Sequence, residues 1–421
     1  MCVATCIDLG PVKEPMIKKI FYGWWIVLAC FLIGFYVGGI VFFGFTAFFE
    51  PIRKEFGWSY TQISFAASLR GLEMGIFGPL AGFLVDRFGP RKLILSGTIT
   101  VGLGLILLSF TQSLAMFYAS FLLIGFGAGG CTAVVTMTAV ANWFRRKVGL
   151  ALGLTASGIG AGGLMVLLIV GLIDLYQWRL TLIILGLGMW VLGIPLSLVV
   201  RNRPELYGYR LDGEVSSPSV QAKEIKDKAV EISLREALKM RSFLYLSIAD
   251  AVRVMALMAL FTHIMPYLAS VGMPRDTAGL VAGAIPLIGI IGRFGLGWLG
   301  DIFDKRHVMA LAIGLISLGL LTFSYVQVKW VIFPFLLFFP IGHGGSMVQR
   351  GSILREYFGR DSFGKIIGVI MGSAAVGGVI GPTTAGWVFD TVGSYKPFWL
   401  LLFGLNGLTT LLILRINKSS S

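Results

Sequence analysis

Apolar runs long enough to cross a membrane recur along almost the whole chain of 421 residues. A transmembrane helix needs about 20 mostly apolar residues. Twelve runs meet this length: 22–49, 60–84, 93–110, 114–140, 147–172, 178–200, 242–268, 277–299, 307–326, 330–349, 364–388 and 395–414. Charged residues make up only 13% of the chain, against about 25% in soluble domains, so this much apolar surface needs lipid around it. The sequence predicts an all-α membrane protein with twelve transmembrane helices in a lipid bilayer.

The net charge of +14 is distributed unevenly along the chain. Only six of the 35 Lys and Arg residues fall in one set of alternate loops, namely Arg53, Lys54, Arg179, Arg275, Lys329 and Lys396. Most of the others lie in the two tails and in the opposite set of loops. Positively charged loops stay on the cytoplasmic side of a membrane, so both termini are expected to be cytoplasmic. The basic charge is therefore interpreted as topology, and no nucleic-acid partner is predicted.

One long polar segment, residues 201–241, separates six spans from six. The expected organisation is a tail (1–20), a six-helix half (21–200), a cytoplasmic linker that ends in a short amphipathic helix (201–241), a second six-helix half (242–415) and a tail (416–421). The halves also repeat each other: "GFLVDRFGPRK" from Gly82 corresponds to "GWLGDIFDKRH" from Gly297, and Gly149, Gly153 and Gly158 correspond to Gly368, Gly372 and Gly377. Two parallel six-helix repeats are typical of transporters that move around a site at mid-membrane.

Several patterns that could indicate other functions are incomplete. The glycine-rich runs "IGFGAGG" (124–130), "TASGIGAGG" (155–163) and "AAVGGVIG" (374–381) lack the preceding strand and the Lys-Ser/Thr ending of a phosphate loop, so they indicate close helix packing. The four cysteines show no metal-ligand spacing, and no disulfide or metal site is expected. No nucleophile–base pattern is present. The sequence predicts neither a cofactor nor an enzyme, and a membrane-embedded enzyme or sensor is the remote alternative.

"GFLVDRFGPRK" resembles the signature that follows the second helix of the major facilitator superfamily, and the resemblance runs from Phe21 to about Leu414. Other stretches resemble the bacterial branch that contains monocarboxylate transporters and the oxalate:formate antiporter: "GPLAGFLVDRFGPRK" (78–92), "NWFRRKVGLALG" (142–153), "RPELYGYRLDG" (203–213), "HIMPYL" (263–268), "GRFGLGWLGD" (292–301) and "EYFGRDSFGKIIG" (356–368). The resemblance implies that Asp86 pairs across the two halves and latches the outward-open state. The candidate latch residues are Gly82, Asp86, Arg87, Arg91, Gly297 and Asp301; alternatively, their charges only anchor a helix end.

A few ionisable residues lie at membrane depth. Arg70 and Glu73 in the second span, and Asp250 and Arg253 in the seventh, are each three residues apart and can pair on one helix face. These pairs are either internal salt bridges or parts of the transport site. Two acids offset two arginines, so the third arginine, Arg293 in the eighth span, is expected to lack a partner. An unpaired buried guanidinium is destabilising, and its planar fork of donors fits a carboxylate.

The resemblance agrees with this interpretation. In the monocarboxylate branch an arginine of the eighth helix binds the substrate carboxylate, and the pattern "GRxxxGxxxD" places it at Arg293. Other charged positions of those relatives are neutral here: Gly289 replaces an aspartate, Phe43 a first-helix lysine, and Ala374 the second cation of the oxalate carrier. The last absence argues against a dicarboxylate. Because the familiar proton-coupling residues are missing, the candidates for proton coupling or charge pairing are Glu73, Asp250 and His263.

The sequence thus predicts a secondary transporter of a small organic anion, a monocarboxylate, driven by proton symport or anion exchange. Arg293, Arg253 and Arg70 are the predicted substrate-binding residues. The protein is expected to function as a monomer in the plasma (inner) membrane of a prokaryote. The alternative keeps the same fold and exports a neutral or amphipathic compound, with the buried charges purely structural.

Overall fold

The computed structural model describes residues 21–69, 84–85, 87–131, 133–144, 147–204, 207, 234–358 and 363–416. All regular secondary structure in these ranges is helical. Ten helical stretches of the described chain are long and apolar enough to cross a membrane. One of them, Leu150–Val199, contains both the fifth and the sixth expected spans, and most of the second expected span lies outside the described residues. The observed helices therefore agree with the twelve that the sequence predicts.

The first half contains α1 (Tyr22–Val37), a π-helical turn (Gly38–Phe43), α2 (Phe45–Phe56), a helix at residues 60–69, α4 (Pro90–Ser109), α5 (Leu114–Gly130), α6 (Ala133–Ala141), α7 (Val148–Ala161), a 3-10 turn (Gly162–Leu164) and α8 (Met165–Val199). Gln177 divides α8 with a left-handed φ of 63°, a conformation rare for any residue but glycine. Glycines bring the π-helical turn close to the 3-10 turn: a methyl group on Gly162 would lie 2.6 Å from the backbone nitrogen of Gly39.

The second half contains α9 (Leu234–Ala237), α10 (Arg241–Ser270), α11 (Arg275–Ile302), α12 (Lys305–Phe323), a 3-10 turn (Lys329–Val331), α13 (Ile332–Phe358), α14 (Phe363–Val392) and α15 (Lys396–Leu414). Helix α10 packs against α14, and α13 packs against both α11 and α12. The described part of the expected amphipathic linker helix is the single turn α9. Ala237 at its end is buried with Phe243 and Leu246 of α10, so this turn packs onto the second half.

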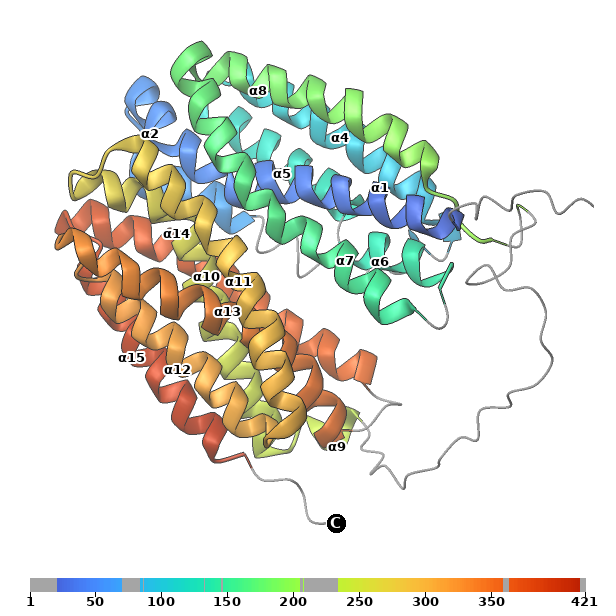
Figure 1. The fold of residues 1–421 in the computed structure, drawn as a ribbon. Helices are drawn as coiled ribbons and strands as arrows, with labels where there is room; N and C mark the ends of the chain where they lie inside the picture. Colours follow the sequence, from blue (N-terminus) through green and yellow to red (C-terminus); the bar gives the residue numbers. More distant parts are fainter. Residues whose placement is uncertain are drawn as a thin grey trace, which may run out of the picture.

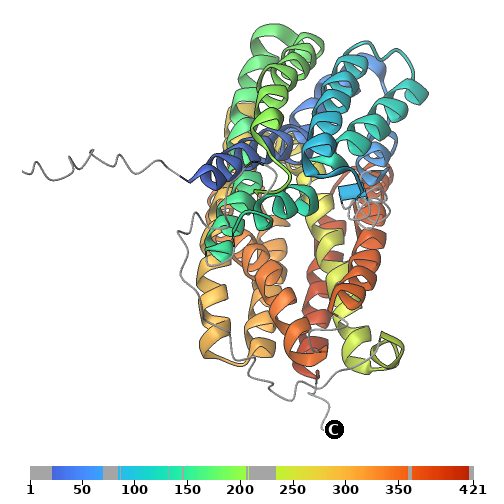
Figure 2. The ribbon, with the colours of Figure 1, turned by 90° about the vertical axis from the view of Figure 1, so that its right-hand side faces the viewer.

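The two halves form two adjacent bundles (Figure 1). We call the end at which α8 finishes and α10 begins the linker end, and the opposite end the far end. Helix α1 begins and α15 finishes at the linker end (Figures 1 and 2). The bundles lie next to each other at the far end, and their axes diverge toward the linker end (Figure 1).

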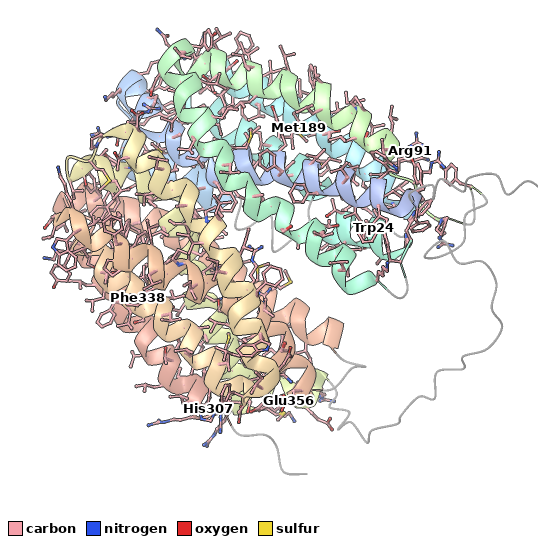
Figure 3. All side chains as sticks on the ribbon, in the orientation of Figure 1. Trp24, Arg91, Met189, His307, Phe338 and Glu356 are labelled. Atoms are coloured by element: carbon pink, nitrogen blue, oxygen red, sulfur yellow. The ribbon has the colours of Figure 1, made fainter. Side chains whose placement is uncertain are left out.

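The side chains on the surface differ between the sides of the helices and their ends. Large apolar side chains are exposed on the outer faces of the helices, among them Leu175 (76% exposed), Phe294 (74%) and Phe333 (71%), as a helix surrounded by lipid requires. Charged side chains gather at the helix ends: His307 and Glu356 lie at the linker end of the second half (Figure 3). Glu356 forms an ion pair of 2.8 Å with Lys305 there.

Candidate functional site

Helix α11 places Arg293 away from the lipid. Its strongly exposed residues Ile291, Phe294 and Trp298 form one stripe along the helix, and Arg293 lies off that stripe by the helical repeat. The Arg293 side chain instead reaches α7 of the other half. A methyl group on Gly160 would lie 3.3 Å from its Nη1 atom, so the glycine leaves the room that the guanidinium fills. Arg293 therefore lies at the interface between the two halves.

Arg293 has neither an acidic partner nor a side-chain hydrogen bond among the described residues, and its Nε atom is buried. A guanidinium in such a place retains its full set of planar donors for another group.

The pair expected at Asp250 and Arg253 is present. Arg253 Nη2 lies 2.6 Å from Asp250 Oδ1, and the two side chains are 4% and 1% exposed. Asp250 also accepts a second arginine, because Arg350 Nη1 of α13 donates to its Oδ2 over 2.9 Å. Both carboxylate oxygens of Asp250 are thus occupied by guanidinium groups, and the acid links α10 to α13.

Arg350 corrects the expected charge count. The tenth span was predicted to end at residue 349, whereas α13 continues to Phe358 and carries Arg350 inside the bundle. The described part of the site therefore contains three arginines, Arg253, Arg293 and Arg350, against one acid, an excess of two positive charges where an excess of one was expected. The physical reason is that a helix does not end where its apolar run ends, so a residue just past the run can still turn inward.

Asp250 lies at one level with Arg293 and Arg350. Asp250, Arg293 and Arg350 each lie eight or nine residues from the linker end of their helices, or about 12–14 Å at the rise of an α-helix. His343 of α13 interacts electrostatically with all three arginines. Its Nδ1 atom is buried and makes no hydrogen bond to the described chain, and its ring lies 6.3 Å from that of Phe261.

The remaining predicted site residues lie elsewhere. Arg70 and Glu73 lie outside the described residues. His263 lies at the far end, remote in sequence position from the arginine level, and is fully buried. Its Nε2 atom lies 3.0 Å from Ser64 Oγ of the first half and 2.9 Å from the Pro382 carbonyl oxygen, and its Nδ1 atom lies 2.9 Å from the Tyr395 hydroxyl. His263 thus joins the two halves.

The candidate latch residues lie at the linker end as far as they are described. Gly82 and Asp86 lie outside the described residues. Arg87 is exposed, and the backbone nitrogen of Arg91 donates to Asn202 of its own half. Gly297 faces Val348 within the second half, and Asp301 is exposed. In this conformation none of the four described latch residues makes a hydrogen bond or ion pair to the other half.

Hydrogen bonds between the halves occur instead at the far end. In the described chain Met265 donates its backbone N–H to Thr46 over 3.1 Å, and Ser68 Oγ lies 2.7 Å from Thr383 Oγ1. The sequence could not identify these residues, because small hydroxyl side chains are common in membrane helices and only the packing shows which of them meet.

Comparison with known proteins agrees with the twelve-helix architecture. The family model described as Major Facilitator Superfamily matches residues 30–349 and 254–416. Monocarboxylate transporter 12 of Mus musculus is 29% identical over 401 residues, which cover 90% of this chain and 82% of that protein. Monocarboxylate transporter 4 of Rattus norvegicus is 25% identical over 428 residues, which cover 98% of this chain and 86% of that protein.

The fold is also that of a solved structure. A bacterial homolog of the human lysosomal transporter Spinster, in an inward-facing and unoccupied conformation, superimposes with a TM-score of 0.69. The match covers 94% of this chain and 95% of the other at 18% sequence identity, a likeness that concerns the fold alone. The family match, the helices and the full-length relatives lead to one assignment: the chain belongs to the Major Facilitator Superfamily and is a multi-pass membrane transporter.

Proposed function

We propose that the protein is a secondary transporter that carries a small monocarboxylate across the membrane, with Arg293 as the anchor of the substrate carboxylate. The observation that carries this proposal is the position of Arg293, a guanidinium at the interface of the two halves that has no acidic partner in the described chain. The monocarboxylate transporters among the relatives support the same class of substrate.

The chemistry of the guanidinium fits this role. Arginine stays charged at any physiological pH and presents a planar fork of donors that matches a carboxylate in two parallel hydrogen bonds. A buried guanidinium without a counter-charge is destabilising, so a substrate carboxylate would stabilise the loaded protein. The anion would lie between α7 and α11, where a relative movement of the halves changes its access from one end of the protein to the other.

The described contacts support an opening toward the linker end. The halves are bonded to each other at the far end, and the described latch residues at the linker end make no such bond. With the Lys- and Arg-rich loops on the cytoplasmic side, the linker end and both termini are cytoplasmic, and this conformation opens inward. The membrane in this proposal is the plasma membrane of a prokaryote, because the loop motifs resemble those of bacterial transporters. The relatives named above come from mouse and rat.

The transport cycle in this proposal is driven by proton symport or anion exchange, with a monomer as the functional unit. Among the described acids and histidines, Asp250 is bonded to Arg253 and Arg350, and His343 interacts electrostatically with all three arginines. His263 belongs to the far end, so a proton there would act on the contact between the halves and not on the substrate.

The test is uptake into proteoliposomes with a panel of labelled two- to six-carbon monocarboxylates, with and without an inward proton gradient. Arg293→Gln should lower uptake at least tenfold, because the fork of donors is lost. Arg293→Lys should raise KM strongly, because a single ammonium cannot make the paired hydrogen bonds. Arg415→Gln removes an exposed arginine at the end of α15 and should leave uptake unchanged.

Wild-type uptake by Arg293→Gln would remove Arg293 from the site and refute the proposal. If the wild type and Arg293→Gln both transport an uncharged compound, and carboxylates do not compete with it, the result would support the alternative function, export of a neutral compound. The melting temperature of each purified variant, measured in one detergent, shows whether a loss of uptake is caused by a loss of folded protein.

A further inference from the structure

A carboxylate of the second half caps a helix of the first half at the far end. Asp390, close to the end of α14, accepts the backbone N–H of Tyr60 over 3.0 Å and that of Thr61 over 2.8 Å. The Thr61 hydroxyl donates to the same carboxylate over 2.5 Å. The first N–H groups of a helix have no partner within the helix and carry partial positive charge. Asp390 thus supplies what a capping residue supplies, from the other half of the protein.

This helix does not need Asp390 in order to start. Ser59 Oγ accepts the backbone N–H of Gln62 over 3.1 Å, and the Gln62 side chain accepts the backbone N–H of Ser59 over 2.9 Å. This reciprocal pair is a capping box, which fixes a helix start from adjacent residues. Because the local cap is already present, the bonds to Asp390 can break without unwinding the helix.

Two further contacts follow Asp390 along the same helix face. Ser64 lies 3.0 Å from His263, and Ser68 lies 2.7 Å from Thr383, so contacts to the second half recur every four residues from Tyr60 onward. The helices lie backbone to backbone here, since a methyl group on Gly386 would lie 2.8 Å from the backbone carbonyl oxygen of Tyr60. Asp390 carries the only charge among the contacts that this helix makes to the second half in the described chain, and it is the outermost of them. A second charged contact at the far end joins other helices, because Arg275 of α11 lies 3.2 Å from Asp174 of α8.

We propose that Asp390 helps to hold the far end shut, as a helix cap that forms when the halves close and is released when they open. The proposal rests on the alternating access proposed above. Opening then breaks contacts only between the halves, and the capping box of Ser59 and Gln62 preserves the released helix. The charge of Asp390 makes its bonds stronger than those of the neutral hydroxyl pairs further inside, so its loss should bias the equilibrium toward a far end that is open.

The experiment measures a distance across the far end by electron–electron resonance. Spin labels are placed at Lys54→Cys on α2 and Ser270→Cys at the end of α10, both exposed, in a chain whose four native cysteines are replaced by alanine. Asp390→Asn and Asp390→Ala should each increase the population with the longer distance at least tenfold, which corresponds to about 1.4 kcal/mol. Thr61→Val removes one of the three donors from the first half. It should also increase the population with the longer distance, but by a smaller factor.

Two controls separate the cap from general damage. Thr391→Ala changes the neighbouring exposed residue, whose hydroxyl bonds only to its own helix in the described chain, and should leave the distances unchanged. Ser59→Ala removes the local cap and should lower the melting temperature without lengthening the distance. The proposal is overturned if both Asp390 variants give the same distances as Thr391→Ala. Since the distances are recorded without substrate, that outcome says nothing against Arg293 as the carboxylate anchor, which the uptake experiment tests.

Discussion

Replacing Asp250 by asparagine should lower the free energy of unfolding by about 3–5 kcal/mol, the usual effect of breaking a buried ion pair on one side. Asp250 is 1% exposed, and its two oxygens accept three donors: Arg253 Nε at 3.0 Å, Arg253 Nη2 at 2.6 Å and Arg350 Nη1 at 2.9 Å. The variant removes the negative charge and keeps the shape, so it isolates the electrostatic contribution.

The magnitude follows from these contacts. A hydrogen bond to a charged group contributes roughly 1.5–3 kcal/mol, and the amide oxygen of an asparagine retains about one of the three bonds. The greater effect is on the arginines, because Arg253 and Arg350 are 4% and 16% exposed and lose their shared counter-charge. Their charges, no longer offset by Asp250, also repel that of Arg293. These terms together place the expected loss within the range given above.

The assay is a double-mutant cycle of Asp250→Asn and Arg350→Gln, with free energies of unfolding from denaturant titration in mixed micelles. Neutralising both partners leaves one fewer unpaired guanidinium, so the double variant should be more stable than the sum of the single changes by at least about 1.5 kcal/mol. Asp301→Asn, which alters an exposed acid of α11, should change stability by no more than about 0.5 kcal/mol. The reasoning is refuted if the two single changes in the free energy of unfolding are additive and Asp250→Asn lowers it by less than about 1 kcal/mol. Water would then reach the charged cluster of Asp250, Arg253 and Arg350.

Two glycine substitutions test the packing around the site. Gly163→Ala would put a methyl group 2.7 Å from a backbone carbonyl oxygen of α11 and should disfavour this conformation by about 1–3 kcal/mol. The spin-label distance across the far end should then become longer. In the control Gly171→Ala the methyl group meets nothing within 4 Å, and the spin-label distance should not change. Gly344→Ala would put a methyl group 3.0 Å from the backbone nitrogen of Arg293 and should reduce uptake at least tenfold by displacing α11. Gly351→Ala on the same helix meets nothing within 4 Å, and its uptake should equal that of the wild type.

Most of the fold could be predicted because the membrane restricts the chain to apolar helices of a set length. Departures occur where packing overrides hydropathy. The first span was expected to end at residue 49, whereas α2 continues to Phe56, and its middle contains the π-helical turn Gly38–Phe43. The break between the fifth and sixth spans was placed correctly at residues 173–177, although nothing in the identity of Gln177 predicts a left-handed residue there.

Site residues could be predicted only where a charged side chain occurs within an apolar span. Arg293 stands out in any count of charges, and the Asp250–Arg253 pair follows from a spacing of three on one helix. Arg350 was missed because it lies one residue beyond an apolar run. The role of His263 depends on which face of α10 meets the first half, and a single sequence does not contain that information. Asp390 likewise becomes meaningful only beside a helix start 330 residues away.

The corrected charge count bears on which anions the site can accept. Arg253 and Arg350 are not free donors, because both are already bonded to Asp250. A second carboxylate on the substrate would have to displace Asp250 from one of them, and it would then exchange one charge-assisted bond for another and gain little. Ala374 offers no charge on α14 to make up the difference. Of the three arginines, Arg293 alone makes no hydrogen bond or ion pair to an acid in the described chain, so the additional arginine that the structure reveals does not turn a site for one carboxylate into a site for two.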